Sequence, residues 1–199
     1  MPDLLAQAQK ALTHPFGPSS DYDLNPDLGL PIDRILRPAA VLVAIEETQA
    51  GLSLLLTKRS ATLKHHPGQI AFPGGKQDAS DPSPEATALR EAQEEIGLPA
   101  SHVEILGKLP NHETVTGFDV TPIVVQVTAP FDVRLEIGEV DEVFSVPLAH
   151  VLSSDNFIVE ARQWQGGLRS YYAVPYGPYY IWGATARILR AWTDSLSHI

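Results

Sequence analysis

The chain contains no cysteine among its 199 residues. This absence excludes a disulfide framework, a thiolate zinc site and a cysteine nucleophile, so any metal must bind through oxygen or imidazole ligands. The sequence also lacks a run of about 18 consecutive apolar residues, and its start has no basic stretch followed by an apolar segment. We therefore expect a soluble, cytoplasmic protein with no membrane partner.

Basic residues are scarce, because 14 Lys and Arg stand against 24 Asp and Glu and give a formal net charge of -10. A charge of this sign repels a phosphate backbone, so we expect no nucleic-acid partner. Hydrophobic residues make up 44% of the chain and charged residues only 19%, a balance that favours a folded protein over a disordered one.

Two segments precede the main body of the sequence. Residues 3–12 show the apolar spacing of a short helix, with Asp3 as a candidate N-cap. Residues 13–33 hold four prolines among Gly, Ser, Asp and Asn, and they are expected to form an arm or linker. We divide the chain into 1–33, an N-terminal helix and Pro-rich arm, and 34–199, one α/β domain.

The main body mixes strand-like and helical segments. Apolar, β-branched runs on either side of the polar turn 47–51 predict a hairpin, and a loop rich in Pro, Gly and Asp is expected at 65–83. The remaining expected strands are 103–109, 118–128, 140–146, 156–162 and 168–174, the last two forming a hairpin around Gly166–Gly167. Helices are expected at 84–96 and 183–195.

The helix at 84–96 has clear ends and two distinct faces. Ser83 is its predicted N-cap, Pro84 suits the first helical position, and Gly97 follows the last residue. At about 100° per residue, the apolar stripe and a set of carboxylates occupy different faces. The carboxylates are Glu91, Glu94 and Glu95.

Such like charges destabilise an isolated helix by about 0.2–0.5 kcal/mol per pair, and a position near the C-terminus is unfavourable for the helix dipole. Two interpretations follow: a solvated acidic face, or a site for a hard divalent cation such as Mg²⁺. The preceding residues favour the cation, because Gly74 and Gly75 allow the backbone to bend tightly and to approach a neighbour closely. A carbonyl in such a loop can complete the oxygen shell of a metal ion.

The combined string GGKQDASDPSPEATALREAQEEIGL resembles the Nudix box. The resemblance implies an α/β/α sandwich around a mixed β-sheet, and an enzyme that hydrolyses a nucleoside diphosphate linked to another moiety with Mg²⁺ or Mn²⁺. It also implies that Glu91 and Glu95 are metal ligands, that Glu94 is a ligand or supports one, and that the Gly75 carbonyl is a further ligand. Arg90 is expected to orient carboxylates through a bidentate pair.

Two features of the box need assignment. Arg90 lies one residue further from Gly75 than the usual spacing, so Asp78 or Asp81 is expected at the early acidic position, ahead of Glu85. The proton acceptor can come from outside the box in this family. Its candidates are Glu139 and then Glu142, which alternatively belong to a solvated loop.

Residues 55–75 resemble the signature of the coenzyme A pyrophosphatase branch of Nudix enzymes, and 179–186 also resemble this branch. Lys64 stands where the branch usually has Arg, so charge is kept but bidentate recognition is not. Lys58, Arg59 and Lys64 are the expected substrate-binding cations, together with Gly74 and Gly75. For the neighbouring His65 and His66 there are two interpretations, phosphate contacts or ordinary loop residues, and we favour the second.

The branch implies a small-molecule substrate, coenzyme A or acyl-coenzyme A, cleaved to 3′,5′-ADP and 4′-phosphopantetheine or its acyl form. A second hypothesis is a Nudix hydrolase of another compound, such as ADP-ribose, a dinucleotide polyphosphate or a damaged nucleoside triphosphate. A third is a binding module that has kept the fold and lost turnover.

Overall fold

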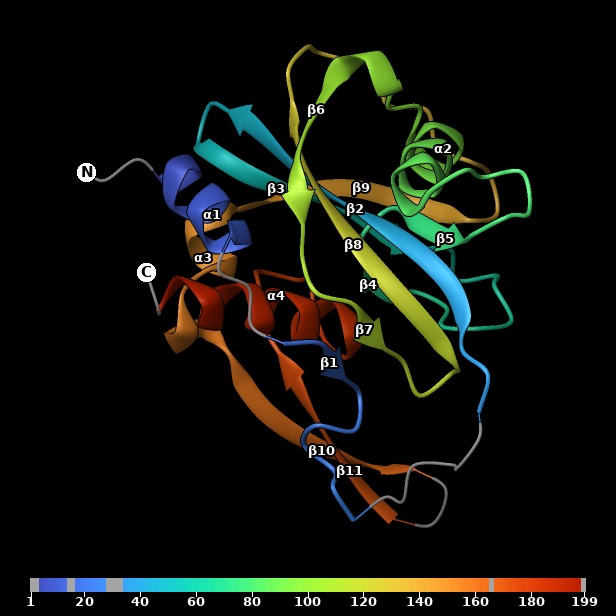
Figure 1. The fold of residues 1–199 in the computed structure, drawn as a ribbon, viewed down its shortest axis with the longest axis vertical. Coiled ribbons are helices and arrows are strands. Elements are labelled where there is room, and N and C mark those ends of the chain that lie inside the picture. The colour runs from blue at the N-terminus through green and yellow to red at the C-terminus, as the bar shows by residue number, and fades with distance from the viewer. Residues whose placement is uncertain (1–3, 14–16, 28–33, 165–166, 198–199) are drawn as a thin grey trace.

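The computed structural model describes residues 4–13, 17–27, 34–164 and 167–197 (Figure 1). Its α-helices are α1 (Leu4–Thr13), α2 (Pro84–Ile96), α3 (Leu148–Val151) and α4 (Ala184–Leu196). Its strands are β1 (Ser19–Ser20), β2 (Arg37–Thr48), β3 (Gly51–Arg59), β4 (Ile70–Ala71), β5 (Gly74–Lys76), β6 (Val103–Lys108), β7 (His112–Glu113), β8 (Phe118–Val127), β9 (Val140–Pro147), β10 (Ile158–Trp164) and β11 (Gly167–Ala173).

Strand β2 is the centre of a mixed sheet. It pairs in parallel with β8 on one side, and on the other side with β3 near its end and β5 near its start, both antiparallel. Its sequence, RPAAVLVAIEET, is a nearly continuous apolar run rather than an alternating one, which is typical of a strand covered on both faces. The predicted hairpin is confirmed, since Thr48 of β2 pairs with Gly51 of β3.

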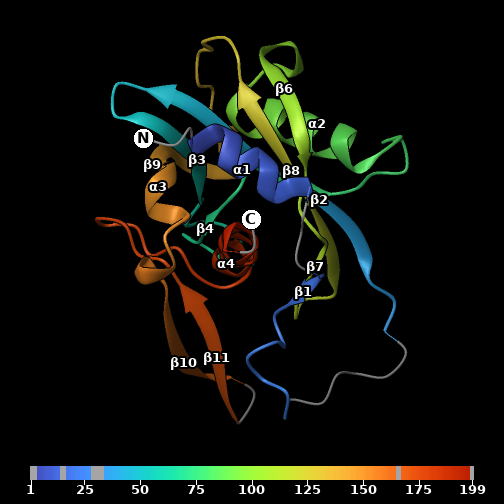
Figure 2. The same cartoon turned by 60° about the vertical axis from the view of Figure 1, so that its left-hand side comes forward.

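Helices cover both faces of this sheet. Ala40, Leu42 and Ala44 of β2 pack in one buried cluster with Ala92 and Ile96 of α2. The other face packs in a second cluster with α1 and α4, where the indole N–H of the buried Trp192 donates to the Ala8 carbonyl at 3.2 Å. The fold is therefore the expected α/β/α sandwich around a mixed sheet, and Figure 2 shows α1 and α4 lying together.

The predicted end signals of α2 are confirmed. Ser83 Oγ accepts a hydrogen bond from the Ala86 N–H, Pro84 opens the helix, and Gly97 takes a left-handed conformation with φ of 74°. The expected loop at 65–83 was wrong in part, because it contains β4 and β5. These strands are only two and three residues long and form by pairing with β3 and β2, so no local period announces them.

The arm and the second hairpin lie on the same side of the molecule (Figure 1). Strand β1 pairs in parallel with β7, while β10 and β11 form a separate two-stranded sheet. The side-chain amide of the buried Asn25 binds both the N–H and the carbonyl of Ser170 in β11. The candidate cap Asp3, part of the arm and Gly166 lie outside the described residues, and the boundary at 33 stays a prediction.

Among the helices of the described residues, none has the length and apolar character needed to cross a membrane.

Candidate active site

Helix α2 brings two of its glutamates against β5. Glu95 is only 4% exposed, and its Oε2 accepts a hydrogen bond from the Gly74 N–H at 3.1 Å. One turn earlier, the carboxylate of Glu91 lies against Gly75, where an added Cβ would stand 2.5 Å from Glu91 Cδ. Only glycine at position 75 therefore leaves room for this carboxylate.

Gly74 is required for a different reason. A Cβ at this position would lie 2.5 Å from the Ala40 carbonyl oxygen and 2.6 Å from Val41 Cα, both in the backbone of β2. The expected close approach of these glycines to a neighbour is thus present. The expected tight bend was wrong, because both glycines lie in β5 and pair with β2.

Arg90 joins α2 to the segment before it. Its Nε and Nη2 donate to Oδ1 and Oδ2 of Asp81 at 3.1 and 2.8 Å, which is a bidentate pair. These bonds hold the pKa of Asp81 well below its usual range. Asp78 is 60% exposed and lies 3.8 Å from Arg90, so of the two aspartates considered for the early acidic position, Asp81 is the one that binds Arg90 closely.

Arg90 also reaches the carboxylates of the helix itself. Its Nη1 lies 3.0 Å from Glu91 Oε1 and 2.9 Å from Glu94 Oε2. Glu94 is exposed and points to this guanidinium, while Glu91 is largely buried. The geometry makes Arg90 a fixed cation among the box carboxylates.

Burial, together with nearby negative charge, raises the pKa of both carboxylates next to β5. Burial raises the pKa of Glu95 to about 7; the Gly74 N–H opposes this shift, and the charges of Glu91 and Glu139 add to it. Burial also raises the pKa of Glu91 against the opposing charge of Arg90. A group of acids with raised pKa values is one that a nearby cation would stabilise in the ionised form.

The donor set fits a divalent cation that is shared with a phosphate ligand. Within the described parts of the chain, no group of three Asp, Glu or His side chains is already arranged to hold a metal ion. Mg²⁺ needs fewer protein ligands than this, because it is usually held by one or two carboxylates plus waters and phosphate oxygens. Glu91 and Glu95, one turn apart beside the backbone of β5, supply such a pair.

Glu139 and Glu142 differ in what surrounds them. Glu139 is exposed in the turn before β9, and its charge contributes to the raised pKa of both Glu91 and Glu95. Glu142 lies within β9, and its Oε1 accepts a hydrogen bond from the Tyr179 hydroxyl at 2.5 Å. Of the two predicted proton acceptors, Glu139 is therefore the one coupled to the box carboxylates.

A cavity of about 690 Å³ begins at Gly74 and Gly75 and extends to the loop at 114–116 and the β10–β11 hairpin. The cavity lining is rich in basic residues, although the chain as a whole is acidic. Five Lys and Arg side chains line the cavity, against one carboxylate, Asp21. The five are Arg37, Arg59, Lys76, Arg162 and Arg169. In a protein of net charge -10, this gathering of cations favours an anionic ligand.

The predicted substrate-binding cations separate in the structure. Arg59 lines the cavity, whereas Lys58 and Lys64 do not. The register between β3 and β9 shifts between Lys58 and Arg59, and such an irregularity re-aims a side chain. His65 and His66, expected to be ordinary loop residues, both line the cavity.

Sequence reasoning missed four of the five cavity cations. Arg37 lies on β2, Arg162 and Arg169 lie on the β10–β11 hairpin more than a hundred residues later, and Lys76 ends β5. The sequence did single out the segment 179–186, which contributes Trp182 and the three following residues to the cavity lining but none of the missed cations.

Comparisons with known proteins identify similar sequences over most of the chain. The family model of the NUDIX domain matches residues 36–165. The chain is 42% identical over 154 residues to the "Uncharacterized Nudix hydrolase NudL" of Citrobacter koseri, which covers 77% of this chain and 80% of that protein. The protein of the same name from Salmonella newport is 43% identical over 155 residues, with the same coverage.

Solved structures are similar at a lower level. The NUDIX domain of Shewanella oneidensis NrtR, complexed with ADP ribose, is 23% identical, covers 64% of this chain and 83% of its own, and gives a TM-score of 0.47. The MutT protein from Methanosarcina mazei Go1 is 26% identical, with 61% and 83% coverage and a TM-score of 0.48.

Proposed function

The chain belongs to the Nudix hydrolase family, and we propose that the nucleoside diphosphate derivative it hydrolyses is coenzyme A or an acyl-coenzyme A. The products are 3′,5′-ADP and 4′-phosphopantetheine or its acyl form. The observation that carries this proposal is the cavity beside β5, whose lining holds five basic side chains and one acid. Its volume lies within the range of about 300–1,000 Å³ that is usual for small-molecule sites.

In the proposed reaction, helix α2 supplies the metal ligands and the turn before β9 supplies the proton acceptor. A bound Mg²⁺ or Mn²⁺ would neutralise negative charge on the pyrophosphate and lower the pKa of water in the site. Glu91 and Glu95 hold the cation, and the Gly74 N–H fixes the position of the Glu95 carboxylate. Glu139, which is exposed and coupled to both glutamates, accepts the proton of the attacking water.

The remaining box residues position this machinery. Arg90 and Asp81 tie α2 to the segment that follows β5, so the helix carboxylates and the β5 backbone keep their relative places. Gly75 keeps the space that Glu91 occupies, and its carbonyl is a further proposed ligand. Glu94 restrains Arg90 from the solvent side.

The deciding experiment is product analysis with coenzyme A in Mg²⁺ or Mn²⁺. Release of 3′,5′-ADP is expected, and Glu95→Gln is expected to abolish it. Glu104→Gln is the matched control, because Glu104 is exposed on β6 and does not line the cavity. No product from a folded wild-type sample with either metal would overturn the proposed substrate.

A substrate panel separates the remaining hypotheses. Relative kcat/KM values for coenzyme A, ADP-ribose, a dinucleotide polyphosphate and an oxidised nucleoside triphosphate rank the substrates directly. Turnover of another compound with coenzyme A untouched makes the protein a Nudix hydrolase of that compound. Binding without turnover across the whole panel makes it a binding module.

A further inference from the structure

Two arginines face each other on the β10–β11 hairpin. Arg162 of β10 stands directly opposite Arg169 of β11 in the strand register, and both side chains line the cavity. Residues so paired have Cβ atoms about 4.5–5.5 Å apart, and like charges at that spacing destabilise the sheet. A hairpin built only for stability would not place two guanidinium groups here.

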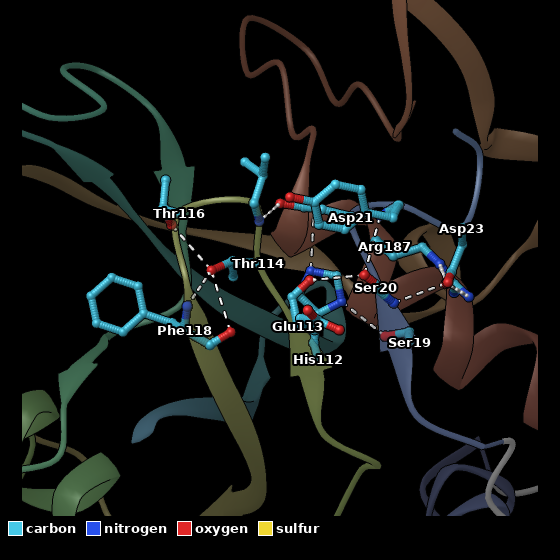
Figure 3. Close-up of polar contacts among 12 residues, drawn as sticks. Ser19, Ser20, Asp21, Asp23, His112, Glu113, Thr114, Thr116, Phe118 and Arg187 are labelled. Atoms are coloured by element: carbon cyan, nitrogen blue, oxygen red, sulfur yellow. Dashed lines mark hydrogen bonds and ion pairs between the residues drawn. The ribbon is translucent and has the colours of Figure 1, made fainter. Parts of the chain in front are cut away.

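Asp21 of the arm offsets part of this repulsion. Its Oδ2 lies 3.1 Å from Arg169 Nη2 and also accepts the Val115 N–H at 2.9 Å, while its Oδ1 lies 3.5 Å from the ring of the buried His112. Figure 3 shows Asp21 beside His112 and the segment that carries Thr114 and Thr116. The carboxylate thus fixes Arg169 at one wall of the cavity, but it carries one negative charge against two guanidinium groups.

Arg162 keeps its charge available to a ligand. No carboxylate of the described residues forms an ion pair with it. Its guanidinium carbon instead lies 4.3 Å from the centre of the Trp182 ring. The centre of the Trp182 ring lies 5.1 Å from the centre of the Tyr171 ring. An aromatic face holds a guanidinium in place without neutralising it.

We infer that Arg162 and Arg169 form a subsite for a phosphate group of the substrate other than the pyrophosphate that is cleaved. This inference rests on the proposed function, under which the pyrophosphate lies beside Gly74 and Gly75, the lining residues that Glu95 and Glu91 contact. The hairpin arginines line the same cavity from β10 and β11, on elements separate from β5 and α2. A phosphomonoester on the ribose carries close to two charges, and two guanidinium forks match its oxygens.

The test compares two nucleotides that differ only in this group. Isothermal titration is expected to show that the wild type binds 3′,5′-ADP about tenfold or more tightly than 5′-AMP. Arg162→Ala is expected to bring the two affinities within about threefold, by weakening 3′,5′-ADP and leaving 5′-AMP nearly unchanged. Lys108→Ala removes the same charge from an exposed position on β6 outside the cavity, and it is expected to keep the wild-type preference.

The folded state of the variant is checked by melting temperature, which is expected to stay level or rise because a like-charge pair is removed. Equal wild-type affinities for the two nucleotides, binding of neither, or a preference that survives Arg162→Ala would each overturn the inference. Failure of the proposed function gives a different result. If Arg162→Ala removes the preference for 3′,5′-ADP but the wild type does not hydrolyse coenzyme A, the phosphate subsite stands and only coenzyme A is rejected as the substrate.

Discussion

Replacement of the buried carboxylate Glu95 by an amide is expected to change how the stability of the metal-free protein depends on pH. Burial raises the pKa of Glu95 in the folded protein to about 7, from an ordinary value of 4.5. The folded state therefore binds more protons than the unfolded chain between these values, and folding stability falls as pH rises through them. Glu95→Gln cannot ionise and can still accept the Gly74 N–H through its amide oxygen.

The size of the effect follows from the two pKa values. At pH 5, Glu95 is protonated in the folded wild type, which has most of the stabilisation that the raised pKa provides. At pH 8, Glu95 is ionised and nearly all of this stabilisation is lost. One pKa unit corresponds to about 1.4 kcal/mol, so the free energy of unfolding of the wild type should fall by about 2.5 kcal/mol relative to Glu95→Gln between pH 5 and pH 8. For a chain of this length, that is about 5–10 °C in melting temperature.

Urea and thermal unfolding of both proteins in EDTA at pH 5, 6, 7 and 8 measures this difference. The same series with Glu104→Gln, which alters an exposed carboxylate on β6, is expected to show a constant gap from the wild type. Adding Mg²⁺ at pH 8 should stabilise the wild type more than Glu95→Gln, because the ionised carboxylate binds the cation. A gap between wild type and Glu95→Gln that stays the same from pH 5 to pH 8 would refute the reasoning.

Three further predictions concern positioning. Gly75→Ala forces Glu91 away and is expected to lower kcat about 100-fold on whichever nucleotide the wild type hydrolyses, with circular dichroism unchanged. Asp81→Asn removes the ionic partner of Arg90 and is expected to lower the melting temperature by several degrees more than Asp78→Asn, as calorimetry can check. Asp21→Asn keeps an acceptor for the Val115 N–H but loses its charge, and steady-state kinetics are expected to show KM raised about tenfold with kcat changed less.

Local sequence patterns predict the elements whose caps, apolar runs and turn residues all lie within one continuous segment. Helix α2 carries its own cap, first-turn proline and terminal glycine, and the β2–β3 hairpin carries two apolar runs and a polar turn. The two short strands of 65–83 have no such signal, because they exist only through pairing with β2 and β3. The box carboxylates could therefore be placed on one helix face from sequence, whereas the strand they face could not.

Four of the five cavity cations could not be predicted, because the structure and not the local sequence brings them together. Arg37, Arg162 and Arg169 are separated by more than a hundred residues or lie across a hairpin, and each is unremarkable in its local sequence. Sequence reasoning instead chose Lys58, Arg59 and Lys64, which are close together along the chain. Of these, only Arg59 reaches the cavity, after the irregularity in β3.

The division of charge explains why the arm and the hairpin matter to the site. The excess acid of the chain includes the glutamates of α2, and under the proposed function these bind a cation before an anionic substrate approaches them. The basic side chains that would draw that substrate in are supplied largely by other elements, and Arg169 lies beyond the residues matched by the family model. Because Asp21 of the arm holds Arg169, and Asn25 holds the neighbouring Ser170, the arm fixes the part of the cavity that the box does not build. Substrate affinity should therefore respond to changes in the arm, while metal binding should respond to changes in α2.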